Sequence, residues 1–147
     1  NLPERFDISY RTADNTEERP WMLHRALFGS IERFLGILIE HTAGNLPRGL
    51  APVQAVVIPI ADRHYDAAAA IAQKIELAEG RAQVYEPNEP MRVKIAKAQA
   101  HKVPYMLVVG DREIEEGTVS VRKREGGQQM TMTVDDFVSI IADARVK

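Results

Sequence analysis

The 147-residue chain contains no cysteine, so neither a disulfide framework nor a thiolate metal site can form within it. Aromatic residues make up only 6% of it, and its formal net charge is −2. The chain therefore has no overall basic field, and any contact with a polyanion must use a local basic patch. No apolar run approaches membrane-spanning length, and no signal peptide is visible. These absences favour a cytoplasmic location without a membrane partner.

The residues that are present suit one ordinary domain preceded by a small remnant of another. Hydrophobic residues make up 45% of the chain and charged residues 27%, as in soluble globular proteins. The first residue is Asn1 rather than methionine, so we expect a piece of a longer protein. The turn-rich segment 45–49 separates two different patterns. It predicts a boundary between one domain over residues 1–46 and a second over residues 47–147.

The first region is organised around a helix predicted over residues 30–43. Ser30 suits its N-cap, because the hydroxyl can accept a hydrogen bond from a free N–H of the first turn, and Gly44 suits its end. One face of this helix is apolar, which predicts packing against a partner. The apolar residues recur at helical spacing: Ile31, Phe34, Leu35, Leu38 and Ile39.

Two strands are predicted before this helix, at Arg5–Tyr10 and Trp21–Leu23, joined by the polar residues 12–19. Such a pair is typical of an antiparallel hairpin. A lone hairpin is marginal in water, so this one requires a larger sheet. The chain does not contain that sheet, and we expect it upstream.

From residue 54 onward, predicted strands and helices alternate. Apolar runs at Gln54–Ile60 and Tyr105–Val109 predict strands buried on both faces, and turns are expected at Gly110-Asp111 and Gly126-Gly127, with a loop over 113–116. This order predicts an α/β fold with a mixed β-sheet flanked by helices. The other predicted strands are Ala82–Tyr85, Thr118–Arg122 and Met130–Thr133, and the predicted helices are His64–Glu79, Met91–His101 and Val134–Ala144.

Arg33 stands out in the first turn of the first helix. A cation there opposes the helix dipole, at a cost of about 0.3–1 kcal/mol, while the free N–H groups of the same turn attract anions. With the small-residue turn Gly29-Ser30, this pattern indicates a phosphate-bearing ligand. The alternative is an ordinary buried strand, turn and helix in which Arg33 pairs with a carboxylate, since a lone arginine does not specify a function.

Two further features have both an ordinary and a functional interpretation. His24 closes an apolar stretch, where a lone histidine is usually a core residue, and a zinc site requires several converging ligands. Residues 88–124 are rich in lysine and arginine, which is typical of solvated helix faces and loops. The functional interpretation is an RNA surface, in which cations hold phosphates and polar side chains read splayed bases.

The stretch His24-Arg25-Ala26-x-x-Gly29-Ser30-x-Glu32-Arg33-Phe34-x-Gly36-Ile37-Leu38 resembles the third signature motif of the threonyl-tRNA synthetases, a class II aminoacyl-tRNA synthetase family. Leu50-Ala51-Pro52-Val53-Gln54 resembles the entry into their anticodon-binding domain. Arg5–Tyr10 and Arg19-Pro20 fit the segment before the motif. The resemblance runs from about Leu2 to the end of the chain. It implies the end of an antiparallel catalytic domain, kept as a hairpin and helix, followed by an anticodon-binding domain.

For the first region, the resemblance implies that Arg33 is catalytic and contacts ATP. Its planar, permanently charged guanidinium suits both phosphate pairing and stacking, and Gly29 and Ser30 allow the backbone close to the nucleotide. His24 corresponds to one of three zinc ligands of the complete enzyme, whose other two ligands lie upstream. We expect that neither zinc nor ATP with Mg²⁺ binds tightly to this chain alone.

For the second region, the resemblance implies that Asn88, Lys102, Glu113 and Arg122 bind the anticodon. Lys102 stands where relatives have arginine, which leaves a point charge in place of a bidentate donor. Glu113 should matter most for discrimination, because a carboxylate accepts only from base amino or imino groups.

The function implied for the complete protein is that of a threonine–tRNA ligase, which activates threonine with ATP and transfers it to its tRNA. The implied enzyme is a homodimer, and this part of it binds the anticodon stem-loop. We expect no ligase activity and weak tRNA binding from the chain alone. The alternative is a stand-alone synthetase-like accessory module for RNA binding or subunit interaction.

Overall fold

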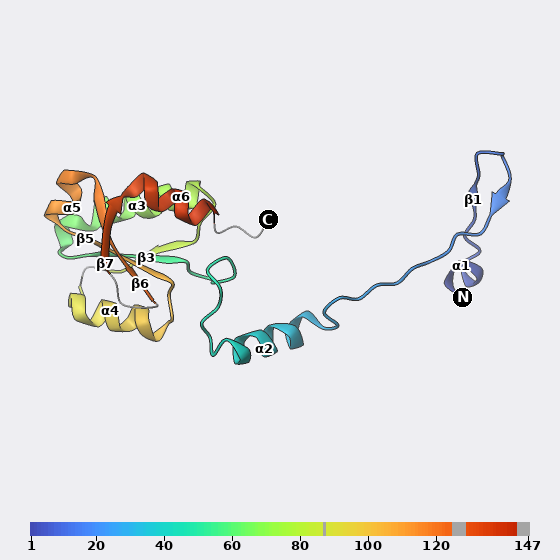
Figure 1. The fold of residues 1–147 in the computed structure, drawn as a ribbon, viewed down its shortest axis with the longest axis horizontal. Coiled ribbons are helices and arrows are strands. Elements are labelled where there is room, and N and C mark those ends of the chain that lie inside the picture. Colours follow the sequence, from blue (N-terminus) through green and yellow to red (C-terminus); the bar gives the residue numbers. More distant parts are fainter. Residues whose placement is uncertain (87, 125–128, 144–147) are drawn as a thin grey trace. The chain divides into compact units, whose positions relative to one another are not determined.

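The computed structural model describes residues 1–86, 88–124 and 129–143 (Figure 1). The chain divides into two compact units, Asn1–Ile37 and Leu38–Lys147. Of the helices in the described ranges, none is long and apolar enough to span a membrane.

The first unit begins with a short helix and a hairpin. Arg19 ties them together, because its guanidinium donates to Pro3 O at 2.7 Å and to the Asp7 carboxylate at 2.9 Å. The helix is α1 (Leu2–Arg5), and the hairpin pairs β1 (Tyr10–Arg11) with β2 (Glu17–Glu18) in antiparallel register.

The hairpin is confirmed, but the predicted strand bounds are wrong. Of the predicted strand Arg5–Tyr10, Arg5 ends α1 and only Tyr10 lies in β1. Thr12 and Thr16 bond through their hydroxyls at 2.7 Å, and Asn15 adopts a left-handed φ of 60°, so the chain reverses directly after β1. The partner strand therefore falls at Glu17–Glu18. Residues 21–23 belong to no strand, since the described part of the chain offers them no sheet, and Trp21 is 97% exposed.

The helix predicted over 30–43 is confirmed as α2 (Ile31–His41). The Arg33 N–H donates to Ser30 Oγ at 3.4 Å, as expected of an N-cap. At the other end Gly44 has φ of 76°, and its N–H donates to Ile39 O at 2.9 Å. The apolar side chains of α2 are not buried, and Ile31 is 65% exposed.

The second unit contains the five-stranded mixed sheet that the sequence predicts. Its strand order is β4-β3-β5-β6-β7. β3 lies parallel to both β4 and β5, whereas β6 pairs antiparallel with β5 and with β7. The strands are β3 (Ala55–Pro59), β4 (Ala82–Val84), β5 (Tyr105–Val109), β6 (Thr118–Lys123) and β7 (Gln129–Thr133). Every residue of β3 and β5 is buried, as their apolar runs predict.

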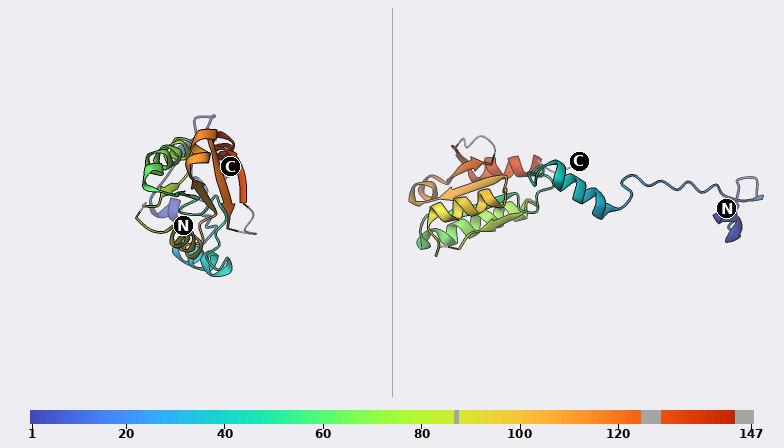
Figure 2. Two further views of the ribbon diagram at one scale, coloured as in Figure 1. Left: turned by 90° about the vertical axis from the view of Figure 1, so that its left-hand side faces the viewer. Right: turned by 90° about the horizontal axis from the view of Figure 1, so that it is seen from below.

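Helices cover both faces of this sheet (Figures 1 and 2). α3 and α6 pack on one face, while α4 packs on the other. Thr133 caps α6 by accepting the Asp136 N–H at 3.1 Å. The helices are the 3-10 turn η1 (Asp62–His64), α3 (Tyr65–Leu77), α4 (Met91–Ala100), α5 (Asp111–Glu116) and α6 (Val134–Asp143).

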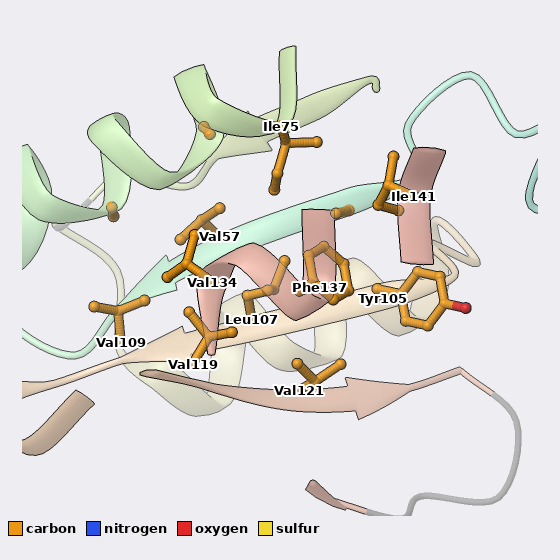
Figure 3. Close-up of a cluster of buried hydrophobic side chains, with 13 residues drawn as sticks. Val57, Ile75, Tyr105, Leu107, Val109, Val119, Val121, Val134, Phe137 and Ile141 are labelled. Atoms are coloured by element: carbon orange, nitrogen blue, oxygen red, sulfur yellow. The ribbon is translucent and has the colours of Figure 1, made fainter. Parts of the chain in front are cut away.

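The larger core lies between the sheet and the α3–α6 layer (Figure 3). Tyr105 on β5 and Phe137 on α6 meet edge to face, with ring centroids 5.3 Å apart. Gly80, after α3, is needed for close packing, because an added Cβ would lie 2.6 Å from Ile75 Cγ2 and 2.7 Å from Ile141 Cγ2. A smaller core beneath α4 contains Val56, Ile58, Tyr85, Ala98, Val103 and Met106.

The turn predicted at Gly110-Asp111 and the loop predicted over 113–116 are wrong, because these residues begin and form helix α5. The Glu113 carboxylate accepts the Gly110 N–H at 3.0 Å and thereby satisfies a donor at the start of the helix. Gly117, with φ of 65°, ends it. The turn predicted at Gly126-Gly127 and the last residue of the helix predicted over Val134–Ala144 lie outside the described residues.

Candidate functional site

Arg33 lies at the start of α2 with an exposed side chain. Ser30 Oγ donates to Glu32 Oε2 at 2.6 Å, and this hydrogen bond holds the pKa of the Glu32 carboxyl below its ordinary value. Gly29 has φ of 64° with open space around it. The Arg33 guanidinium forms no hydrogen bond or ion pair with any described residue, so the carboxylate partner of the alternative interpretation is not found. This helix start can accept an anion.

A hollow of about 610 Å³ in the first unit is lined by His24 but by none of Gly29, Ser30 and Arg33. Within the described ranges no group of three or more histidine, aspartate or glutamate side chains could hold a metal ion. A zinc site requires three or four such ligands, and the chain has no cysteine. The residues present therefore do not form a zinc site by themselves.

Arg122 lies on β6, on the same face of the sheet as α4. It pairs in register with Met106 of β5, which packs in the core beneath that helix, and residues paired across strands share a face. On β7 its register partner is Gln129, whose side-chain amide donates to Ser120 Oγ. β6 and β7 thus present a polar strip beside α4.

Arg122 borders a hollow of about 420 Å³ against α4, whose other lining residues are Met91, Arg92, Ile95, Ala96 and Gln99. The hollow combines two guanidinium groups and an amide with apolar walls. Among the described residues, Arg122 has no hydrogen-bond or ion-pair partner. It is half-buried and its charge is available to a ligand.

Asn88 lines a separate hollow of about 390 Å³ on the opposite side of α4, with Lys97 and His101. The Lys97 ammonium lies 5.4 Å from the centre of the Tyr85 ring and 3.7 Å from Glu89 Oε2. Asn88 itself is exposed. α4 therefore has one predicted anticodon residue on each side.

Lys102 is used within the fold. Its ammonium donates to Ala43 O, just after the end of α2, where a cation complements the helix dipole. Arg124 extends this contact by donating to Lys102 O at 2.9 Å and to Leu46 O at 3.3 Å. Lys102 thus lines neither the Asn88 nor the Arg122 hollow, and its contact with Ala43 O fastens the segment before β3.

Glu113 is half-buried on α5, just beyond the end of β5. Its Oε2 accepts the Gly110 N–H, which leaves Oε1 as the oxygen open to a ligand. Arg122 pairs with Met106, near the opposite end of β5. At 3.3 Å per residue, the two positions are separated by about 10 Å or more along the strand. The predicted residues therefore lie along an extended surface and not around one pocket.

The sequence interpretation missed a polar network around one buried histidine at the carboxyl end of the sheet. His64 is almost fully buried, and its Nε2 lies 2.8 Å from Asp111 Oδ1, while Arg63 donates to both oxygens of that carboxylate. The hydrogen bonds from Arg63 and His64 hold the pKa of Asp111 well below its ordinary value. The sequence could have indicated this network, because polar residues follow both buried strands, β3 and β5, closely. Residues that follow neighbouring parallel strands meet at one edge of the sheet.

A buried lysine lies near the same edge. Lys94 on α4 is fully buried, and its ammonium donates to Pro59 O at 3.0 Å. Burial lowers its pKa, while the nearby Asp62 and Glu89 carboxylates act in the opposite direction. Its contact with the end of β3 makes it part of the core and not of the open surface.

Two family profiles match the chain. Residues 54–144 match the anticodon binding domain, and residues 1–42 match the tRNA synthetase class II core domain of the G, H, P, S and T enzymes. The first match covers the whole sheet with its helices, and the second covers the hairpin and α2.

Curated relatives named threonine–tRNA ligase match almost the whole chain. That of Sulfurihydrogenibium sp. (strain YO3AOP1) is 50% identical over 143 residues, which are 97% of this chain and 22% of that protein. That of Thermus thermophilus is 51% identical over 138 residues, which are 94% of this chain and 21% of that protein. The chain thus spans about a fifth of the length of these relatives.

Solved structures give the same result. The RNA binding domain of threonyl-tRNA synthetase from Cryptosporidium parvum Iowa II aligns with a TM-score of 0.91 at 29% identity, covering 100% of this chain and 38% of that one. Prolyl-tRNA synthetase from Cryptosporidium parvum aligns with a TM-score of 0.66 at 18% identity, covering 97% of this chain and 31% of that one. The second likeness concerns the fold alone.

Proposed function

This chain belongs to the anticodon-binding domain family, and we propose that it binds the anticodon stem-loop of a threonine tRNA through residues 47–147. The proposed first domain, residues 1–46, is then the end of a class II catalytic domain. The two family matches leave residues 43–53 unassigned, and the proposed boundary falls among them.

The observation that carries the proposal is the cationic hollow beside α4. Arg122 and Arg92 can hold phosphates or pair with base edges, while Met91 and Ile95 offer apolar walls to an unstacked base. RNA is read in sequence mainly where its bases are splayed out in loops. A net charge of −2 makes such a local site necessary for any RNA contact.

Recognition along an extended surface fits a loop that presents several bases. Asn88 on one side of α4 can donate and accept through its amide, and Arg122 on the other side donates only. Glu113 Oε1 accepts from an amino or imino group at the carboxyl end of the sheet. The Lys102 ammonium contributes positive potential while it fastens Ala43.

We propose further that the complete protein is a threonine–tRNA ligase that uses ATP with Mg²⁺. Arg33, with Gly29 and Ser30, then binds the ATP phosphates at the start of α2, where the guanidinium has no partner in the described part of the chain and the helix N–H groups favour an anion. His24 serves as a zinc ligand only if an upstream region supplies the others. A cytoplasmic homodimer is the proposed form of the complete enzyme.

The alternative, a stand-alone accessory module, gains no specific support. The match of residues 1–42 to a catalytic core domain and the exposed apolar face of α2 favour attachment to a catalytic domain. The reading frame upstream of Asn1 decides between them. A catalytic domain containing a cysteine and a second histidine supports the ligase, and a stop codon supports the module.

Fluorescence anisotropy with labelled anticodon stem-loops, at about 0.15 M salt, tests the RNA proposal. We expect the threonine stem-loop to bind more tightly than single-base variants by about 1–3 kcal/mol. Arg122→Met should weaken binding, whereas Lys74→Met, the same charge change on the α3 face, should not. Equal affinity for every stem-loop would reject anticodon recognition.

A further inference from the structure

Two loops meet at the carboxyl end of the sheet. One follows β3 and contains η1, and the other follows β5 and begins α5. The Ile60 N–H donates to Val109 O at 3.0 Å. Gly110 lies close to this loop, because an added Cβ would come within 2.6 Å of Ile60 Cδ1. The start of α5 is thereby pressed against the loop that carries His64.

The tautomer of His64 is set by its hydrogen bonds. Its Nδ1 accepts the Ala61 N–H at 3.2 Å, so the ring proton is on Nε2, which donates to Asp111 Oδ1 at 2.8 Å. The imidazole is only 3% exposed, so its orientation is fixed by the surrounding core. Arg63 Nε donates to the same Asp111 oxygen at 3.0 Å, and a second guanidinium nitrogen donates to Oδ2. Asp111 is therefore held from one side by three hydrogen bonds.

Asp111 is the first residue of α5, and Glu113 follows two positions later. α5 has only six residues, and a helix this short does not hold its own position in water. None of its residues is buried, so packing in the core contributes little to its orientation. Its main side-chain attachment to the β3 side of the sheet is the Asp111 carboxylate.

We propose that Asp111, gripped by His64 and Arg63, is a positioning residue that orients α5 so that Glu113 Oε1 faces an anticodon base. The proposal rests on the proposed function. His64 then does more than pack in the core. Through Asp111 it fixes the orientation of α5 and so the direction of the Glu113 carboxylate.

A merely structural role makes a different prediction. The Asp111 carboxylate is 61% exposed, and ion pairs at exposed positions contribute little to stability. Loss of Asp111 should therefore change the thermal midpoint little, while it lets α5 turn and misdirects Glu113. Discrimination between anticodons should suffer more than folding.

The test is a double-mutant cycle on the ratio of dissociation constants for a single-base-swapped and a matched stem-loop, measured with this chain. Glu113→Gln should lower the ratio by about tenfold. Asp111→Ala should lower it toward the same value, and Asp111→Asn, which keeps an acceptor for His64, should lower it less. Adding Asp111→Ala to Glu113→Gln should change nothing more, because the positioned group is already altered.

Glu116→Gln is the matched control. It removes the negative charge from the Arg112–Glu116 pair, whose atoms lie 3.0 Å apart within the same helix, without touching the β3 loop, and it should leave the ratio unchanged. Asp111→Asn serves if Asp111→Ala does not fold. A folded Asp111→Ala with the parent ratio, or losses that add in the double variant, would overturn the positioning role.

Failure of the proposed function is separately visible. A parent that does not discriminate between stem-loops rejects the proposed function and this inference together. If the parent discriminates between stem-loops and the Glu113→Gln variant does so equally well, only the inference is rejected. The Glu113 carboxylate would then not be the group that contacts the base.

Discussion

Tyr105 and Phe137 lie edge to face in the core, with ring planes inclined by 84°, and join the central strand β5 to helix α6 (Figure 3). Phe137 is fully buried. Phe137→Ala should lower the free energy of unfolding by about 3–5 kcal/mol, because it removes apolar contacts and leaves a cavity. Urea unfolding followed by circular dichroism measures this. Leu77→Ala on α3, where Leu77 is 79% exposed, is the control and should change stability by less than about 0.5 kcal/mol.

Gly80 should not tolerate a methyl group. The nearest atoms belong to Ile75 and Ile141 on two different helices, and neither helix can move without disturbing the core. Gly80→Ala should therefore cost about 1–3 kcal/mol of unfolding free energy. Gly36→Ala, at a helical position with nothing within 4 Å, should increase helicity instead. Equal effects of the two changes would contradict the packing account of Gly80.

The Asp111 network predicts a small acid-sensitive contribution to stability, small because the carboxylate is 61% exposed. In the folded chain the pKa of Asp111 lies below its ordinary value of 3.8. The ionised carboxylate therefore stabilises the fold at pH values above 3.8. The contribution disappears as the pH falls below it. In Asp111→Asn, the unfolding free energy should therefore fall less steeply than in the parent between about pH 4 and about pH 2. If the unfolding free energies of the parent and of Asp111→Asn changed in parallel with pH, the pKa of Asp111 would be the same in the folded and unfolded chains.

In the complete ligase that we propose, Arg33 should be required for the first half-reaction. Arg33→Lys keeps the charge but loses the planar, bidentate guanidinium, so ATP–pyrophosphate exchange should slow by at least about tenfold. Arg11→Lys, on the exposed strand β1, is the control for the same chemical change. If the Arg33→Lys variant exchanged pyrophosphate at the wild-type rate, the assignment of Arg33 to the ATP site would be rejected.

The sequence predicted the second unit well and the first unit less well, for a physical reason. The runs at Gln54–Ile60 and Tyr105–Val109 are apolar on both faces, and only a central strand satisfies such a run. Residues 21–23 have the same apolar character without a sheet in the described chain to join, so local pattern alone misassigned them. α5 was missed because its start depends on one contact, between Glu113 and Gly110, that periodicity does not reveal.

The candidate site was predictable in type but not in arrangement. Arg122 and Asn88 were chosen by resemblance, and only the fold shows that they lie on opposite sides of α4. The contact of Lys102 with Ala43 O joins positions 59 residues apart, which sequence spacing cannot foresee. The pairing of His64 with Asp111 depends in the same way on the adjacency of β3 and β5.

Mapping of amide chemical shifts in this chain, titrated with the matched anticodon stem-loop, tests the central claim most directly. The account predicts the largest changes along β6 and β7, on α4 around Arg92 and Gln99, and at α5. The outer surface of α3 should stay unchanged. Changes concentrated on α3 and α6, with β6 and α4 unaffected, would show that RNA does not bind the surface that carries Arg122 and Glu113.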